Sequence, residues 1–169
     1  MQNDTQADRE KLWSMVKQHK FAMMTTLREG EALHSRPMTT IAHDGDDSLW
    51  FFAAADSSTT EDLTQHAQVC LSYADSSKPD FVCVSGRASV IEDKSKKRAL
   101  WTKGVEAWFP QGPDSSDVVL VQVTPHHAEF WDSKTSKLAR LFSYARATAT
   151  GTPPRDVGEH RDVSVGRQS

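Results

Sequence analysis

The sequence predicts a mainly β protein, an antiparallel β-barrel or strongly bent sheet with helices inserted between the strands. Three observations lead to this fold class. Short segments with the two-residue alternation of β-strands follow one another closely, as in Val82-Cys83-Val84-Ser85. Turn-forming residues separate these segments, as in Arg28-Glu29-Gly30-Glu31. The pattern also lacks the regular alternation of strand and helix that builds parallel sheets.

The first predicted element is a helix over Thr5–His19, because apolar residues recur there at helical spacing. Either Asp4 or Thr5 is suited to cap it. After this helix the sequence changes to the pattern of strands. Its first two predicted strands, Phe21–Leu27 and Ala32–Ala42, form a hairpin.

The middle of the chain predicts three more strands and a helix. The strand Ser48–Ala54 precedes a short helix over Ser57–His66, which begins with hydroxyl and acidic residues. A second hairpin joins Val69–Ala74 to Phe81–Glu92. Gly86 inside the second of these strands indicates a bulge or a bend.

The C-terminal part predicts two strands between two helices, followed by a tail. The elements are a helix over Lys94–Lys103, a loop over 104–117, strands over Val118–Thr124 and His127–Trp131, and a helix over Lys134–Ala147. Residues 148–169 are polar and rich in Thr, Gly, Pro and Arg, which predicts an extended or partly disordered tail. Residues 1–147 are therefore expected to form the single domain.

The composition limits the kind of protein. A chain of 169 residues has the size of one domain. Its 20 basic and 23 acidic residues leave a net charge of −3, which gives no basic surface for nucleic acid or an anionic membrane. The longest apolar run, Leu49–Ala55, is far shorter than a membrane span, and the polar N-terminus shows no secretory signal. We therefore expect a cytoplasmic protein that binds neither nucleic acid nor membrane.

The cysteine and histidine spacing predicts no metal site. Cys70 and Cys83 lie apart in apolar segments without a CxxC motif, which indicates buried, inert thiols in a reducing cytosol. The pair His126-His127 is expected to form a turn before the last strand. As neighbouring strand residues, the two would point to opposite faces and could not easily share a metal.

The segment His34–Thr40 has the residue types of a phosphate site. Arg36 lies inside a predicted strand, where a guanidinium needs an anion or an acidic partner because it stays charged. Pro37 holds this arginine extended, and two threonines add hydroxyl donors. The next strand supplies Trp50–Ala53, an aromatic and small-residue run with free backbone groups at its end. Asp56–Thr60 then places four hydroxyl groups at a helix N-terminus, which favours anions.

Two interpretations of these residues stay open. In the first, they form a phosphate-binding site beside a flat apolar wall. In the second, Arg36 is an exposed residue paired with Asp56 or Glu61, and the hydroxyl residues only cap the helix.

Four segments carry a family resemblance. They are Ser35-Arg36-Pro37-Met38, Leu49-Trp50-Phe51-Phe52, Phe81-Val82-Cys83-Val84-Ser85-Gly86-Arg87-Ala88 and Glu129-Phe130-Trp131-Asp132. In this order they resemble the pyridoxamine 5′-phosphate oxidase-like, flavin-binding split-barrel superfamily, and within it the bacterial general stress protein group. The resemblance extends from about Lys11 to Tyr144. It implies a homodimer of six-stranded antiparallel split β-barrels that binds flavin mononucleotide (FMN) in two clefts at the subunit interface.

The resemblance also implies which residues bind the cofactor. Along the phosphate and ribityl chain it places Arg36, Pro37, Met38, Thr39 and Thr40. At the isoalloxazine edge it places Phe51, Phe52 and Ala53, the last two through their backbone. Ser57, Ser58 and Thr59 take the phosphate, and Trp131 covers the site from the same or the partner subunit.

The departures from the family pattern bear on function. Thr59 stands where members commonly have a lysine, so one charged phosphate contact is lost, which predicts weaker FMN binding or tolerance of FAD. We expect a flavin-dependent oxidoreductase of unknown substrate. The alternatives are a non-catalytic flavin-binding or redox-sensing stress protein, and a structural dimer without ligand. Oxidation of pyridoxamine 5′-phosphate is least favoured, because Gly166–Ser169 shows no match to the oxidase's substrate-binding arginine and histidine.

Overall fold

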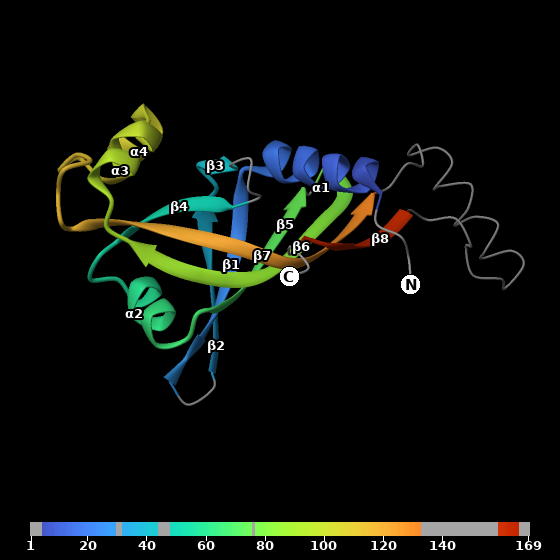
Figure 1. Cartoon of the computed structure of the whole chain (residues 1–169), viewed down its shortest axis with the longest axis horizontal. Coiled ribbons are helices and arrows are strands. Elements are labelled where there is room, and N and C mark those ends of the chain that lie inside the picture. The colour runs from blue at the N-terminus through green and yellow to red at the C-terminus, as the bar shows by residue number, and fades with distance from the viewer. Residues whose placement is uncertain (1–4, 30–31, 44–47, 76, 133–158, 166–169) are drawn as a thin grey trace, which may run out of the picture.

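A computed structural model describes residues 5–29, 32–43, 48–75, 77–132 and 159–165 of the chain. These residues form one antiparallel sheet of eight strands with four helices around it (Figure 1). The predicted mainly β, antiparallel fold class is therefore confirmed. The sheet has eight strands instead of the six that the resemblance implied, since a two-residue strand and a C-terminal strand also belong to it.

Seven strands lie in the order β2-β1-β5-β6-β7-β4-β3, and β8 pairs separately with β7. The strands are β1 Phe21–Arg28, β2 Ala32–Thr39, β3 Ala42–His43, β4 Leu49–Ala54, β5 Gln68–Asp75, β6 Lys78–Ile91, β7 Val118–Asp132 and β8 Glu159–Ser164. The helices are α1 Gln6–His19, α2 Ser58–Gln65, α3 Lys94–Leu100 and α4 Lys103–Trp108.

The connection between β2 and β3 requires the sheet to curve. These strands stand at opposite ends of the strand order, yet only Thr40 and Ile41 separate them in the chain. The Thr40 N–H donates to the carbonyl oxygen of Lys20, beside β1, at 2.8 Å. The Ile41 N–H donates to that of Trp50, in β4, at 2.8 Å. Because consecutive residues serve the two ends of the sheet, the sheet bends into an open barrel.

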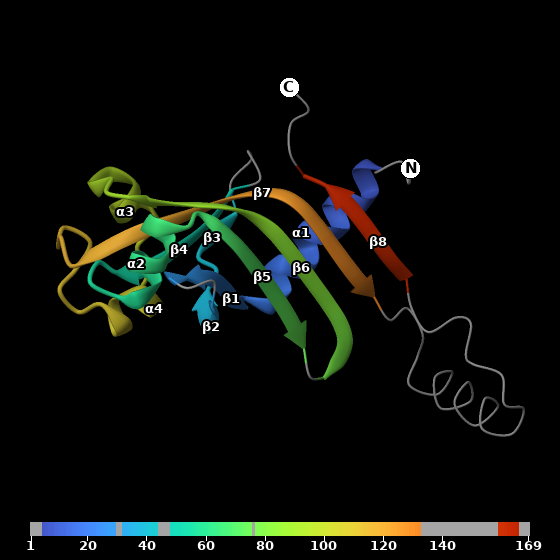
Figure 2. The same cartoon turned by 90° about the horizontal axis from the view of Figure 1, so that it is seen from below.

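Strand β7 connects the two halves of the molecule. One of its edges pairs with β6 along almost its whole length. Its other edge pairs first with β4, over residues 118–123, and then with β8, over residues 127–132. Both views show β7 running from the region of α3 and α4 to the region of β8 (Figures 1 and 2).

Two apolar clusters stabilise this arrangement. The larger one fills the barrel beneath α1 and includes the fully buried Phe51, Tyr73 and Phe130. The smaller one lies between β4, the start of β7 and the α3–α4 segment. In it the Phe52 ring meets the edge of Trp101, with ring centroids 5.2 Å apart.

A buried lysine ties the α3–α4 segment to β7. Lys97 is only 1% exposed. Its Nζ donates to the carbonyl oxygens of Ser115 and Val118, both at 2.8 Å, so the buried ammonium has the acceptors it needs. The contact holds the turn before β7 in place and so positions the strand that pairs with β4.

The structure corrects three expectations from the sequence. Residues 104–117 were expected to be a loop, but Lys103–Trp108 forms α4, capped by the Thr102 side chain. The two strands expected over 118–131 are the single strand β7. Part of the expected tail is the strand β8. The helix expected over Lys134–Ala147 lies outside the described residues.

The expected irregularity at Gly86 is confirmed. The register between β6 and β7 shifts between Ser85 and Gly86, so that Gly86 lies opposite Pro125. A Cβ atom at Gly86 would lie 2.4 Å from the Thr124 carbonyl oxygen. Backbone cannot yield as a flexible side chain does, and therefore the close strand approach requires glycine.

Gly86→Ala is accordingly expected to destabilise the protein by about 1–3 kcal/mol, because the methyl group forces β6 and β7 apart. Urea unfolding followed by circular dichroism measures the effect. Gly104→Ala is the control: its Cβ would meet only the Thr102 hydroxyl at 3.7 Å, and alanine in α4 should stabilise by about 0.5 kcal/mol. Equal stability of the Gly86 variant and the wild type would contradict the packing argument.

Candidate functional site

Five polar side chains from β1, β2 and α2 meet at one side of the barrel, and we call them the arginine cluster. They are Thr26, Arg28, His34, Arg36 and Asp62. The register of β1 and β2 pairs Thr26 with His34 and Met24 with Arg36. Alternate residues of each strand therefore present their side chains to the same face, where α2 supplies the carboxylate.

The Asp62 carboxylate is the centre of the cluster, and its side chain is only 4% exposed. Its Oδ2 accepts hydrogen bonds from the Thr26 hydroxyl at 2.8 Å and from Arg36 Nη2 at 2.7 Å. Its Oδ1 accepts one from Arg28 Nε at 3.3 Å. Burial raises the pKa of the Asp62 carboxyl, but these hydrogen bonds outweigh burial and hold the pKa below its usual value.

The cluster carries an excess of positive charge. The His34 Nδ1 atom contacts Nη2 of both Arg28 and Arg36. A guanidinium nitrogen can only donate, so both arginines direct donors at this ring nitrogen. Two guanidinium groups then face the single carboxylate of Asp62, which leaves a net charge of about +1.

One donor of the cluster has no hydrogen bond within the described part of the chain. It is the Nε–H of Arg36, a buried atom. The Arg36 side chain is 13% exposed and that of Arg28 is 43% exposed, so the positive charge reaches the surface mainly through Arg28. Excess positive charge with an unused donor is suited to an anionic group.

The acidic partner of Arg36 differs from both residues considered in the sequence analysis. Asp56 and Glu61 are exposed and lie away from the cluster, whereas Asp62 is buried against it. Sequence reasoning missed Asp62, although buried positions fall together at Thr59, Thr60, Asp62 and Leu63 on one side of α2. Only Leu63 among these positions is apolar, so the sequence held no clear signal that Asp62 is buried.

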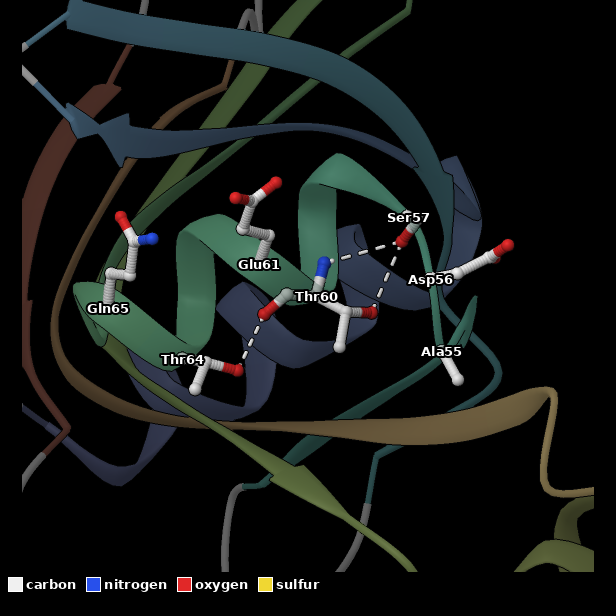
Figure 3. A pocket seen from close by; sticks show the side chains of 7 residues that line it. All are labelled: Ala55, Asp56, Ser57, Thr60, Glu61, Thr64 and Gln65. Carbon is white, nitrogen blue, oxygen red and sulfur yellow. Dashed lines mark hydrogen bonds between the residues drawn. The ribbon is translucent and has the colours of Figure 1, made fainter.

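The N-terminus of α2 uses its hydroxyl groups for its own cap. Ser57 is the N-cap, and its side chain accepts a hydrogen bond from the Thr60 N–H at 3.3 Å (Figure 3). The hydroxyls of Ser57 and Thr60 both donate to the Ala54 carbonyl oxygen, at 2.8 and 2.7 Å. Ser58 is exposed, and Thr59 is buried at 6% exposure, so these predicted phosphate ligands face different surroundings.

The backbone of Phe52 lies at an open edge of β4. Odd-numbered residues of β4 direct their backbone groups toward β7, as the Ala55 N–H bond to Asp117 shows. Even-numbered residues face the other way, where the Trp50 carbonyl accepts from Ile41. Strand β3 ends before it reaches Phe52. Within the described residues no strand pairs with β4 at Phe52 on that edge, whereas the backbone of Ala53 faces β7.

The predicted site residues of β2, together with Thr40 directly after it, divide between the two faces of the sheet. Arg36, Met38 and Thr40 point inward: Met38 packs against the core, and Thr40 Oγ1 lies 2.9 Å from the Tyr73 hydroxyl. Pro37 and Thr39 are exposed on the opposite face. One ligand molecule therefore cannot contact both sets of side chains in one subunit.

Two predicted aromatic residues are already engaged within the subunit. Phe51 is fully buried in the barrel core and offers no side-chain surface. Trp131 is 36% exposed and stacks on His160, with ring centroids 4.8 Å apart. Trp131 lies eleven residues along β7 from Leu120, the partner of Phe52, a separation of roughly 35 Å for a strand. A single subunit therefore does not bring Trp131 and Phe52 to the same ligand.

A shallow pocket of about 360 Å³ lies beside α2 (Figure 3). Its lining residues are Ala55, Asp56, Ser57, Thr60, Glu61, Thr64 and Gln65. Ser57 is the predicted site residue among them. The carboxylates of Asp56 and Glu61 make this pocket unfavourable for a phosphate, so the arginine cluster is the better candidate for binding an anion.

A histidine and two acidic residues meet on the β7–β8 ribbon. The possible ligand atoms of His127, Glu129 and Asp162 lie within 4.8 Å of one another. His127 Nδ1 lies 3.2 Å from Asp162 Oδ1 and its Nε2 lies 3.7 Å from Glu129 Oε1, so the imidazole lies between the two carboxylates. His126 and His127 belong to the continuous strand β7, so they are not the turn that the sequence suggested.

The two cysteines differ from expectation. Cys70 and Cys83 were expected to be buried and separate, but both are half-buried and their Sγ atoms lie 3.3 Å apart.

The curved sheet forms an open antiparallel barrel, and the arginine cluster gives it a site beside α2 that attracts anions. The profile of the pyridoxamine 5′-phosphate oxidase-like family matches residues 7–155. The chain therefore belongs to the pyridoxamine 5′-phosphate oxidase-like family, as the four sequence segments indicated. Within the described residues, no helix is long and apolar enough to cross a membrane.

Several known proteins are similar to this chain. Protein bli-3 of Neurospora crassa is 29% identical over 164 residues, covering 90% of this chain and 78% of that protein. The general stress FMN/FAD binding protein of Xanthomonas citri has a solved structure with 28% identity and a TM-score of 0.68, covering 80% of this chain and 95% of that one. The general stress protein 26 of Bacillus anthracis has a solved structure with 21% identity and a TM-score of 0.64. The match covers 72% of this chain and 92% of that one, and it shows that the two share a fold.

Asp62→Asn is expected to destabilise the protein by about 3 kcal/mol at neutral pH, because it leaves two arginines without their buried counter-charge. The folded-state pKa of Asp62 is lowered, so its contribution is present above the unfolded-state pKa of about 3.9 and is lost as the pH falls through the folded-state pKa.

Denaturant unfolding between pH 7 and pH 3 measures this contribution. The difference in the free energy of unfolding between the wild type and Asp62→Asn should stay constant near neutral pH and become smaller below about pH 4. Glu61→Gln, an exposed change on the same helix, should alter stability by less than about 0.5 kcal/mol. A difference in the free energy of unfolding that becomes larger as the pH falls would contradict the proposed charge state of Asp62.

Proposed function

We propose that the protein binds a flavin nucleotide, FMN or FAD, through the arginine cluster and the open edge of β4. The observation that carries this proposal is the excess positive charge of Arg28 and Arg36 around the buried Asp62. Family membership and the FMN/FAD binding of the Xanthomonas citri relative support it. Thr59 is buried at the position where the family commonly has a lysine, so the phosphate would depend on the two arginines.

The two parts of the proposed site lie next to the same helix. Asp62 belongs to the middle of α2, and Ser57 caps its N-terminus beside the open edge of β4. A helix rises by about 1.5 Å per residue, so the two are separated by roughly 8 Å along its axis. A phosphate at the arginine cluster would leave the attached flavin ring within reach of the Phe52 backbone.

The residues at both places fit the chemical groups of a flavin nucleotide. Arg28 would hold the phosphate by charge-assisted hydrogen bonds, and the charge of the less exposed Arg36 would add to the attraction. The Phe52 N–H and C=O would orient the ring, whose polar edge has both acceptors and a donor. When bound, the flavin would supply electron transfer, and the protein would supply binding and orientation. An oxidoreductase of unknown substrate is the proposed activity.

Flavin titration should show tighter binding of FMN than of riboflavin, because only FMN has the phosphate. Quenching of flavin fluorescence measures both affinities, with FAD as a third ligand. Arg36→Lys keeps a positive charge for Asp62 but loses the forked donor, and Arg28→Ala removes the exposed charge. Each variant should weaken FMN binding by about tenfold or more while leaving riboflavin binding nearly unchanged.

Arg98→Ala is the matched control, because Arg98 is exposed and pairs with Asp114 away from the cluster. Equal affinities of the wild type for FMN and riboflavin would refute the phosphate site. With the loaded protein, oxidation of NADH or NADPH by an electron acceptor would assign catalysis. A lack of turnover would favour the non-catalytic flavin-binding alternative.

We also propose that the protein is a homodimer with the flavin at the subunit interface. Large apolar side chains are exposed on the outer face of neighbouring strands: Phe21 at 63%, Met23 at 44%, Phe81 at 46% and Trp131 at 36%. Phe81 and Trp131 are direct cross-strand partners, and Met23 shares their face through Ser72 and Cys83. Such an exposed apolar patch is typical of an interface. A second subunit would also allow its Trp131 to cover a flavin that the first subunit holds.

Phe81→Glu should shift the protein from dimer to monomer, because it places a charge in the centre of this apolar face. Analytical ultracentrifugation measures the mass, and the same variant should bind FMN more weakly. Trp108→Glu is the control: Trp108 is 82% exposed but belongs to α4, away from this face. A monomeric wild type, or a dimer that withstands Phe81→Glu, would refute this interface.

A further inference from the structure

The strands β5 and β6 bring the only two cysteines of the chain into contact. The register pairs Cys70 with Ser85 and Ser72 with Cys83, so the cysteines are diagonal neighbours on one face of the sheet. The right-handed twist of a sheet brings one set of diagonal neighbours closer together. Their Sγ atoms lie 3.3 Å apart. Both side chains are half-buried in the single subunit and lie on the face of the proposed dimer interface, so a small solute reaches them when the subunits separate.

We propose that Cys70 and Cys83 form a reversible intramolecular disulfide when the protein meets hydrogen peroxide, which makes this face of the sheet a redox modification site. A disulfide bond is about 2.05 Å long, so the sulfur atoms must approach by roughly 1.2 Å. Side-chain rotation supplies part of this approach. The hydrogen-bonded ladder of β5 and β6 resists the rest, so the bond is expected to be strained and easily reduced.

The surroundings give the two thiols different roles. The hydrogen bond with Cys83 lowers the pKa of Cys70 to about 6, against the upward effect of burial, and Ser72 and Ser85 contribute in the same direction. The hydrogen bond with Cys70, burial and the charge of Glu129 raise the pKa of Cys83. These effects favour Cys70 as the attacking thiolate and Cys83 as the partner that carries the proton.

The reaction follows from these roles. The Cys70 thiolate attacks one oxygen of the peroxide, which breaks the O–O bond, forms a sulfenic acid and releases hydroxide. The Cys83 sulfur then attacks the Cys70 sulfur and displaces its hydroxyl group, while the Cys83 proton passes to the departing oxygen. The released hydroxide takes up the proton that Cys70 lost on ionising. Two thiols therefore lose two electrons in total, and one peroxide is reduced to two molecules of water. A dithiol or glutathione returns the pair to the reduced state.

The test uses the full chain, first reduced and freed of reductant, at a concentration low enough for the subunits to separate. One equivalent of hydrogen peroxide should remove both free thiols together, as counted with a chromogenic disulfide reagent. Mass spectrometry without reductant should show Cys70 and Cys83 peptides joined within one chain, and dithiothreitol should restore both thiols. Thiols that persist, or that join different chains, would overturn the proposal.

Single variants separate the roles of the two cysteines. In Cys83→Ser, Cys70 should stop at the sulfenic acid and be trapped by dimedone. In Cys70→Ser, Cys83 should react with peroxide about tenfold more slowly or less at neutral pH, because it stays protonated. Ser14→Ala, an exposed change on α1, is the control that should leave both thiols as reactive as in the wild type. Equal reaction rates of the two single-cysteine variants would overturn the assignment of Cys70 as the attacking thiolate.

Discussion

The two-residue connection between β2 and β3 is the constraint on which the rest of the structure depends. Thr40 bonds beside β1 and Ile41 bonds to β4, so consecutive peptide groups join the two ends of one sheet. A flat sheet of seven strands in a row would be about 29 Å wide between its outer strands, far beyond what two residues span. The sheet therefore curves, and its curvature creates the interior that Phe51, Tyr73 and Phe130 fill.

Curvature also explains why the polar residues of the site gather beside α2. The helix covers the opening near β1 and β4, and it inserts Asp62 between the arginines that β1 and β2 supply. A buried carboxylate is tolerated there because both of its oxygens accept hydrogen bonds from the surrounding donors. As a result, each guanidinium uses part of its hydrogen-bonding capacity within the protein. A phosphate would interact with the positive charge that Asp62 leaves unbalanced.

Most of the barrel could be predicted from the sequence, because strand alternation, turn residues and the glycine in β6 are local signals. The extents of β1, β4, β5 and β6 follow such patterns closely, and Gly86 marks the bulge. The single strand expected over Ala32–Ala42 was wrong: β2 ends at Thr39 and Ala42 begins β3, because Thr40 and Ile41 bond to opposite ends of the sheet. Strand β8 and helix α4 could not be predicted in this way. The first has a polar sequence that is ordered by pairing with β7, and the second is a six-residue helix held by Thr102 and by packing of Val105. Tertiary contacts outweigh local preference at both.

The sequence by itself determined the fold class, the family resemblance and the segment that carries Arg36, since each depends on residue types at fixed spacing. Only the tertiary structure decided that Asp62 is the partner of Arg36, that Phe52 lies at an open edge, and that Cys70 and Cys83 touch. These facts depend on which strands become neighbours and in which register. Register depends on the turn that joins each hairpin and on which face of each strand is buried, and both are settled only when the strands pack together.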